Sequence, residues 1–176
     1  MSSIPVLHLL SGKIAAGKST LAARLAAAPA TVLVAEDAWL ARLYGPEMAS
    51  VADYVRYSAR LRAAMGPHVT DLLRAGLSVV LDFPANTLAN RAWMRGIFEA
   101  AGADHRLHLI DLPDEICRAR LRQRNAAGGH DFAATDAQFD QITAHFVPPA
   151  AEEGFRVVVH AGRPGFETGR RDDVWL

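Results

Sequence analysis

Cysteine is almost missing from this chain, which has Cys117 alone among its 176 residues. A single thiol cannot form an internal disulfide, so we expect a protein of the reducing cytoplasm. Excess charge of either sign is also missing, because 19 Lys and Arg residues balance 19 Asp and Glu residues. No bulk positive field is available to attract a phosphate backbone, and a nucleic-acid partner is therefore not expected.

Long apolar runs are missing as well. No run approaches the roughly 18 residues that a membrane span needs, and the first residues lack the basic and apolar regions of a signal peptide. The seven histidines do not have the spacing of zinc ligands. We therefore expect neither membrane association nor zinc chemistry, and one domain over residues 1–176, as a monomer or a homodimer.

Short apolar runs alternate with longer segments of helical period along the chain. The runs predict strands at residues 6–10, 31–35, 77–81, 107–112 and 155–160. The segments between them predict helices, the first at 18–27. Strands that alternate with helices indicate an α/β fold, here a five-stranded parallel sheet with helices on both faces.

Punctuating residues divide the helical segments. Apolar positions recur at helical spacing from residue 51 to residue 73, but Gly66 and Pro67 interrupt them, so we expect a kink or two helices there. Asn86 or Thr87 caps a helix that runs toward residue 101. Pro113 opens a further helix that runs to about residue 124.

The stretch at about 125–153 predicts a small helical lid. It begins with a Gly-rich hinge, and Thr135 opens a capping-box pattern with Phe139, Ile142 and Phe146 on one face of the helix. An insertion before the last strand is where a closing lid would lie, although an ordinary packed helical hairpin has the same pattern. Residues 162–176 are predicted to form a loosely docked tail.

Residues 12–19 read GKIAAGKS and match the pattern G-x-x-x-x-G-K-[ST] at every fixed position. Gly12 and Gly17 let the backbone curl so that several N–H groups point inward. Those donors and the following helix N-terminus would bind a di- or triphosphate. Lys18 would place a cation on the β and γ oxygens, and Ser19 would offer a hydroxyl to Mg²⁺.

The loop contributes further candidates for nucleotide binding. Lys13 is a second lysine that either contacts phosphate or is only a solvated charge. The remaining candidates are backbone neighbours of the glycines and of Ser19, namely Ala15, Ala16 and Thr20. The alternative for the whole motif is a glycine-rich turn with an incidental lysine.

Carboxylates follow two of the predicted strands. Ligand sites in open α/β sheets lie at the carboxyl ends of the strands, so Asp37 should share the crevice with the loop. It would accept a proton from an attacking hydroxyl, or it would only cap the helix at 38–44. Glu36 is the weaker candidate for the base. Asp82 ends an apolar strand, a Walker-B type pattern whose carboxylate holds or orients Mg²⁺.

Two further polar residues follow Asp82 at the same edge. Asn86 is expected to cap a helix, and Arg91 is either a surface residue or a substrate contact. Four arginines crowd the helix before the lid, and those four apart share a face: Arg120 with Arg124, and Arg118 with Arg122. We expect Arg124 to grip the transferring phosphoryl group, unless the row is only a solvated face.

These motifs together resemble the P-loop kinases of the AAA_33 type, a group that includes polynucleotide 5′-hydroxyl kinases, chloramphenicol phosphotransferase, gluconate kinases and zeta toxins. The resemblance covers about residues 4–160 and implies a three-layer, nucleoside-kinase-like P-loop fold. It implies ATP and Mg²⁺ as cofactors, Asp37 as general base and Lys18 as the Walker-A lysine. It also implies that Arg120 lies near the adenine and Arg124 near the phosphates.

The sequence departs from nucleotide kinases in its lid, because no arginine occurs between Arg124 and Arg156. We therefore expect transfer of the γ-phosphoryl group of ATP to a hydroxyl of a small molecule. The alternatives are a nucleic-acid 5′-hydroxyl kinase and a slow NTPase that acts as a regulatory module. Acidic residues of the lid and its return would favour a cationic acceptor if they face the cleft: Asp131, Asp136, Asp140, Glu152 and Glu153.

Overall fold

The computed structural model describes residues 4–128 and 134–161. Its strands are β1 (Val6–Gly12), β2 (Thr31–Ala35), β3 (Ser78–Pro84), β4 (Asp104–Asp111) and β5 (Val157–Ala161). Its α-helices are α1 (Lys18–Ala26), α2 (Glu36–Tyr44), α3 (Val51–Arg74), α4 (Leu88–Ala101), α5 (Asp114–Ala127) and α6 (Asp136–Thr143). Two short 3₁₀ turns complete it, η1 (Gly45–Glu47) and η2 (Ala151–Glu153).

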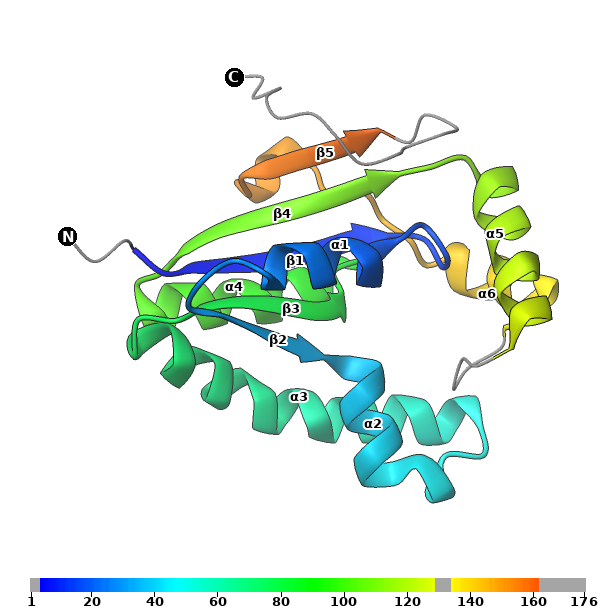
Figure 1. Ribbon diagram of the computed structural model, residues 1–176, viewed down its shortest axis with the longest axis horizontal. Helices are drawn as coiled ribbons and strands as arrows, with labels where there is room; N and C mark the ends of the chain where they lie inside the picture. Colours follow the sequence, from blue (N-terminus) through cyan, green and yellow to red (C-terminus); the bar gives the residue numbers. More distant parts are fainter. Residues whose placement is uncertain (1–3, 129–133, 162–176) are drawn as a thin grey trace.

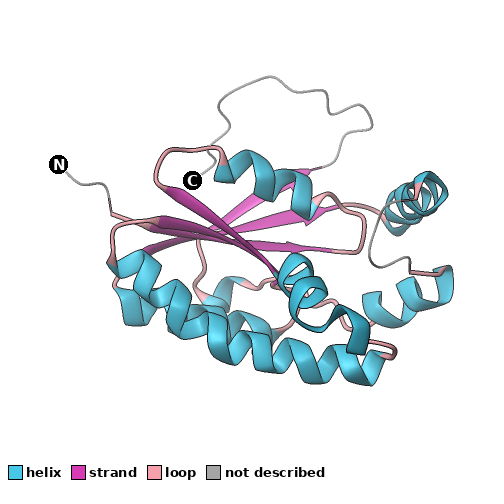
Figure 2. Cartoon of the chain, turned by 60° about the horizontal axis from the view of Figure 1, so that its bottom comes forward, coloured by secondary structure: helices cyan, strands magenta, loops and turns pink. Residues whose placement is uncertain are grey.

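The five strands form one parallel sheet in the order β2-β3-β1-β4-β5. α1 lies over one face, and α3 and α4 cover the other (Figures 1 and 2). This arrangement confirms the predicted α/β class with helices on both faces. β1 lies between β3 and β4, so the chain leaves β1 at the centre of the edge formed by the carboxyl ends of the strands.

Each face of the sheet has its own apolar core. Leu7, Leu9 and Leu81 point to the side of α3 and α4, and none of them is accessible to solvent. Leu10 and Val80 point to the opposite side, where side chains of α1, α5 and α6 pack on them. Burial on both faces explains why the central strands β1 and β3 read as continuous apolar runs rather than as alternating ones.

Helix α3 runs unbroken through Pro67, so the expectation of two helices at this point was wrong. Proline removes one backbone N–H donor, but the buried stripe of α3 continues on both sides of it through Leu61, Met65, Val69 and Leu73. That packing holds the helix together against the local cost of the proline.

The C-terminal elements differ from their predicted bounds. β5 is Val157–Ala161, and α6 ends at Thr143, so Phe146 lies beyond the helix. Phe139 is buried while Ile142 is 44% exposed, so the predicted apolar face of α6 is wrong beyond Phe139. The capping box at Thr135 is present. In the described parts of the chain, no helix is long and apolar enough to span a membrane.

Three imidazoles form a hydrogen-bonded row across β1, β4 and β5. His8 Nδ1 lies 3.0 Å from His108 Nε2, and His108 Nδ1 lies 3.0 Å from His160 Nε2. Burial, together with the nearby His8, His160 and Arg106, lowers the pKa of His108 to about 3. The row is therefore neutral at physiological pH, and its three rings lie on the sheet as uncharged polar groups.

Candidate active site

The loop between β1 and α1 has the shape of an anion site. Gly17 is the N-cap of α1 with φ of 107°, and no side chain caps the helix, so its first N–H groups are left for a ligand. A Cβ at Gly12 would lie 3.0 Å from the carbonyl oxygen of Ile110, which excludes any side chain there. Ala15 also has a positive φ, 59°. The predicted phosphate loop thus lies where the sequence placed it.

Lys18 is folded back into the loop. Its Nζ donates to the carbonyl oxygens of Gly12 at 2.6 Å and Lys13 at 2.8 Å. Burial lowers the pKa of Lys18 to about 8, although the carboxylates of Asp82 and Asp37 act in the opposite direction. A bound phosphate group would supply a negative charge to pair with the ammonium group of Lys18.

Asp82, Ser19 and Asp37 gather beside Lys18. Ala35 pairs with Asp82 across β2 and β3, so the start of α2 meets the end of β3. Burial raises the pKa of Asp82, while a hydrogen bond from Ser19 and the charge of Lys18 partly offset that rise. A hydroxyl that is hydrogen-bonded to a carboxylate places two oxygen ligands side by side, and Mg²⁺ is bound by oxygen ligands. Ser19 and Asp82 therefore fit the metal role predicted for them.

Asp37 lies in the first turn of α2 and is exposed to solvent. The N-cap of α2 is Ala35, so the capping role considered for Asp37 was wrong. Asp37 follows Ala35 by two residues, so the pairing of Ala35 with Asp82 brings it to the end of β3, and its charge acts on Lys18 and Asp82. An exposed carboxylate beside the phosphate loop is suitably placed to meet an incoming substrate.

The side chain of Asn86 forms hydrogen bonds to the start of the loop instead of capping a helix. Its Oδ1 accepts from the Gly12 N–H at 2.9 Å, and its Nδ2 donates to the Gly12 carbonyl at 2.9 Å. Thr87 caps α4, as the second of the two predicted options. The asparagine side chain thus pairs with Gly12 as another backbone strand would, and fixes the entry to the loop.

Helix α5 holds the loop from the other side. Lys13 forms an ion pair with Asp114 and donates to the Leu112 carbonyl at 3.2 Å, so it is not the freely solvated charge that one interpretation predicted. Arg120 donates to the Ala16 carbonyl at 3.2 Å. The Nε of Arg124 is buried and has no hydrogen-bond partner, and this unused donor fits the predicted phosphoryl contact.

Arg91 is completely buried, so it is not the surface residue that one interpretation predicted, and it does not face a substrate. It donates to both carboxylate oxygens of Glu153 at 2.6 and 2.8 Å. It also donates to the carbonyls of Ala85 at 3.0 Å and Val147 at 2.8 Å. The residue fastens the chain after α6 to α4, and nothing in the sequence pattern indicated this.

Most acids considered for a cationic acceptor are already paired. Asp136 pairs with Arg122 and Asp140 with Arg118, both on α5, and Glu153 pairs with Arg91. Asp131 lies outside the described residues. Of the five predicted acids, only Glu152 among the described ones lacks an ion pair, so the case for a cationic acceptor loses its basis.

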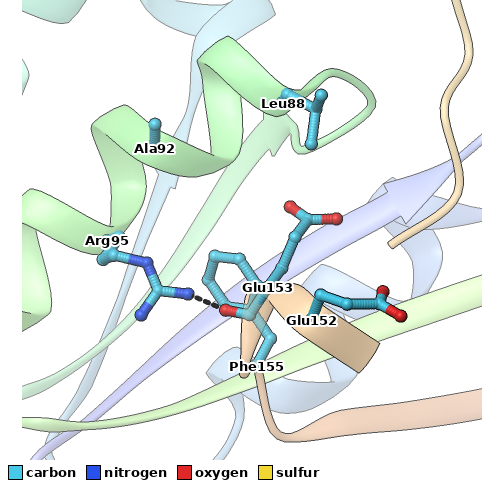
Figure 3. Close-up of a pocket in the computed structure, with 6 residues that line it drawn as sticks. All are labelled: Leu88, Ala92, Arg95, Glu152, Glu153 and Phe155. Atoms are coloured by element: carbon cyan, nitrogen blue, oxygen red, sulfur yellow. Dashed lines mark hydrogen bonds between the residues drawn. The ribbon is translucent and has the colours of Figure 1, made fainter. Parts of the chain in front are cut away.

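A groove of about 510 Å³ with a mixed apolar and charged lining lies between α4 and η2 (Figure 3). Its lining comes from two segments: Leu88, Ala92, Arg95, Glu152, Glu153 and Phe155. None of these residues belongs to the loop at residues 12–19, and neither Asp37 nor Asp82 is among them. The groove is therefore distinct from the edge of the sheet that carries the loop and these two carboxylates.

Comparisons with known proteins agree with this geometry. The chain resembles a solved structure from Chloroflexus aurantiacus regarded as a kinase, with a TM-score of 0.73 and 18% identity over 92% of this chain and 87% of that one. It resembles a gluconokinase of Sinorhizobium meliloti with a TM-score of 0.55 and 15% identity over 90% and 83% of the two chains. The TM-scores show a shared fold, and at identities this low the likeness shows the fold alone.

A third likeness is to a chain of the Pnkp1/Rnl/Hen1 RNA repair complex, with a TM-score of 0.63 and 22% identity. It covers 82% of this chain but only 45% of the other. No curated protein sequence matches the chain significantly. The family description "AAA domain" (AAA_33) matches residues 7–149, from β1 to beyond α6. The chain thus has the fold of the P-loop kinases and belongs to the AAA_33 family.

Proposed function

We propose that this protein is an ATP-dependent phosphotransferase that moves the γ-phosphoryl group to a hydroxyl of a small molecule. The observation that carries the proposal is the position of the exposed Asp37 at the carboxyl end of β2, where the pairing of Ala35 with Asp82 brings the start of α2 to the strand end beside the phosphate loop. A nucleotide-binding loop alone would support hydrolysis. An exposed carboxylate beside it supplies a base for an acceptor hydroxyl.

Each residue has a distinct task in the proposed reaction. Asp37 accepts the hydroxyl proton, the acceptor oxygen bonds to the γ-phosphorus, and the bond to the β–γ bridging oxygen breaks, which leaves ADP. Lys18 and Arg124 offset the negative charge on the transferring group. Mg²⁺, held by Ser19 and Asp82, would supply further charge neutralisation. The first N–H groups of α1 orient the phosphates.

The acceptor we propose carries no large negative charge. The cations Arg118 and Arg122 on α5 are neutralised by Asp140 and Asp136, and the chain as a whole has no net charge. A polyanion gains its affinity from unpaired basic groups. The likeness to the RNA repair complex keeps a nucleic-acid 5′ end as the second candidate.

Transfer of label from γ-labelled ATP·Mg²⁺ to a panel of sugars, nucleosides, antibiotics and 5′-hydroxyl oligonucleotides tests the proposal. We expect label in one class of acceptor, and a loss of about 10²- to 10⁴-fold for Asp37→Asn with ATP affinity little changed. Asp71→Asn, the same change at an exposed site of α3, is the control.

Two other results would redirect the assignment. Label in the oligonucleotides, with binding that weakens steeply as salt rises, would establish the nucleic-acid kinase. Release of inorganic phosphate alone, at equal rates in the native protein and Asp37→Asn, would contradict phosphoryl transfer and favour a slow NTPase.

A further inference from the structure

Glu36 is a buried carboxylate immediately before the proposed base. It is only 2% exposed, whereas the neighbouring Asp37 is exposed. Glu36 Oε2 accepts a hydrogen bond from Tyr54 Oη at 3.1 Å, and Oε1 accepts one from Arg62 Nη2 at 3.3 Å. Both partners belong to α3. Consecutive carboxylates of α2 therefore point to different surroundings, one to protein and one to solvent.

The hydrogen bonds continue from Arg62 to the end of β3. Arg62 Nη1 donates to Asn90 Oδ1 at 2.8 Å, and Asn90 Nδ2 donates to the Pro84 carbonyl at 2.8 Å. Pro84 follows Asp82 by two residues on the same strand. A single chain of polar contacts thus joins the first turn of α2 to the strand that carries the proposed metal ligand.

This arrangement has an energetic cost that folding alone does not require. Burial raises the pKa of Glu36, while Arg62 and Tyr54 act to lower it and Asp37 raises it further. An apolar residue at position 36 would avoid the desolvation of a carboxylate beside a second one. The hydrogen bonds of this polar network form in only one orientation of α2, so the network fixes the orientation of that helix.

The backbone before α2 is held by the pairing of Ala35 with Asp82, but no side-chain cap restrains the first turn of the helix. Its N-cap, Ala35, offers no side-chain hydrogen bond, so the first turn has no capping contact. Glu36 is the residue of that turn that is tied to another element. A helix that begins without a cap frays readily, and fraying would displace Asp37.

We propose that Glu36, Tyr54 and Arg62 form a positioning network that fixes the first turn of α2 and thereby sets the location of Asp37 relative to Asp82. The inference rests on the proposed function in making Asp37 the base. Glu36 itself does not take the proton, because its carboxylate oxygens are engaged by α3. A displacement of about 1 Å at a reacting group lowers a rate by about 10²-fold.

Arg62→Met and Tyr54→Phe test the network, with Arg60→Met and Tyr57→Phe as matched controls on the same helix. Hydrogen exchange by mass spectrometry reports on the peptide that covers α2, with α1 as an internal reference. Transfer rates are measured with the acceptor that the panel identifies. Tyr54→Phe removes one oxygen and keeps the ring, so it preserves the fold.

We expect faster exchange in α2 for both network variants, and unchanged exchange in α1. We expect kcat to fall about 10- to 100-fold for Arg62→Met and several-fold for Tyr54→Phe, with KM for ATP unchanged. Glu36→Gln keeps an acceptor oxygen and should retain more activity than Glu36→Ala. The control variants should behave as the native protein.

Three outcomes separate this inference from the proposed function. Full kcat in Arg62→Met, or unchanged exchange in α2, would overturn the network. A loss in Glu36→Gln as large as in Asp37→Asn would make Glu36 a base and would also overturn it. Absence of transfer in the native protein, with faster exchange in the variants, would overturn the kinase and leave the restraint on α2 established.

Discussion

The segment from α6 to η2 is fastened differently at its two ends. At the α6 end, Asp136 and Asp140 pair with arginines of α5 that are 66% and 28% exposed. At the η2 end, Glu153 pairs with Arg91, whose side chain is wholly buried and also holds two carbonyls. Both ends use arginine and carboxylate, so charge does not distinguish them. Burial does, since water competes for the exposed pairs and is excluded from Arg91.

Replacement of Arg91 by Met should have the largest effect on stability. It leaves the carboxylate of Glu153 and the carbonyls of Ala85 and Val147 without their donors. Breaking a buried pair in this way costs about 3–5 kcal/mol in the free energy of unfolding. Urea unfolding measures it, with Arg118→Met, which removes an ion pair at the α6 end, as the comparison. Equal losses in the free energy of unfolding for the two variants would mean that burial does not distinguish the two ends of the segment.

Replacement of Asn86 by Ala extends the comparison to a buried polar group without charge. The Gly12 N–H loses its partner inside the protein, which costs about 1–3 kcal/mol. ATP binding should also weaken, because the entry to the loop is no longer fixed. Urea unfolding and calorimetric titration with ATP·Mg²⁺ check the two effects. Asn125→Ala, near the end of α5, is the control, and the same losses there would contradict the role of Asn86.

The imidazole row makes stability depend on pH. The folded-state pKa of His108 is lowered to about 3, while an unfolded chain has about 6.5. Between these values the unfolded chain binds one proton more, so stability falls as pH drops through that window. The contribution of His108 is about 1.4 kcal/mol per pH unit.

Urea unfolding between pH 4 and 7 measures that slope. We expect His108→Gln to reduce it, since the amide does not titrate. His68→Gln, the same change at an exposed position of α3, is the control and should keep the native slope. A native slope in the His108 variant would show that other groups cause the acid sensitivity.

Replacement of Arg122 by Met should have the smallest effect. The residue is 66% exposed and its partner Asp136 is 44% exposed, so solvent screens the pair. We expect a urea midpoint that matches the native protein within experimental error. A clear drop, comparable to that of Arg91→Met, would break the distinction drawn between the two ends.

The sheet and the loop were readable from the sequence because their signals are local. Apolar runs set the strands, and glycine, lysine and serine at fixed spacing set the loop at residues 12–19. The carboxylates at 37 and 82 followed from a rule about strand ends. Pairing of Ala35 with Asp82 then brought the two together, as that rule requires.

The roles of Asn86, Arg91 and Glu36 were not readable, because each depends on a distant partner. Asn86 meets Gly12 across 74 residues and Arg91 meets Glu153 across 62. Helix periodicity places a side chain on a face but says nothing about which carbonyl lies opposite. The alternative of two helices at Pro67 was wrong for a similar reason, because buried packing on both sides of the proline outweighed the local signal.

The backbone conformation of Ala15 bears on when the phosphate loop forms during folding. An alanine with φ of 59° is locally unfavourable by about 1–2 kcal/mol, so residues 12–17 have little tendency to adopt this shape alone. The contacts that enforce it come from Asn86, Asp114 and Arg120, all far along the chain. Such contacts close large loops and form late. We therefore expect a nascent chain to emerge with its most recognisable motif unformed, and the loop to take its binding shape only after β3 and α5 have docked.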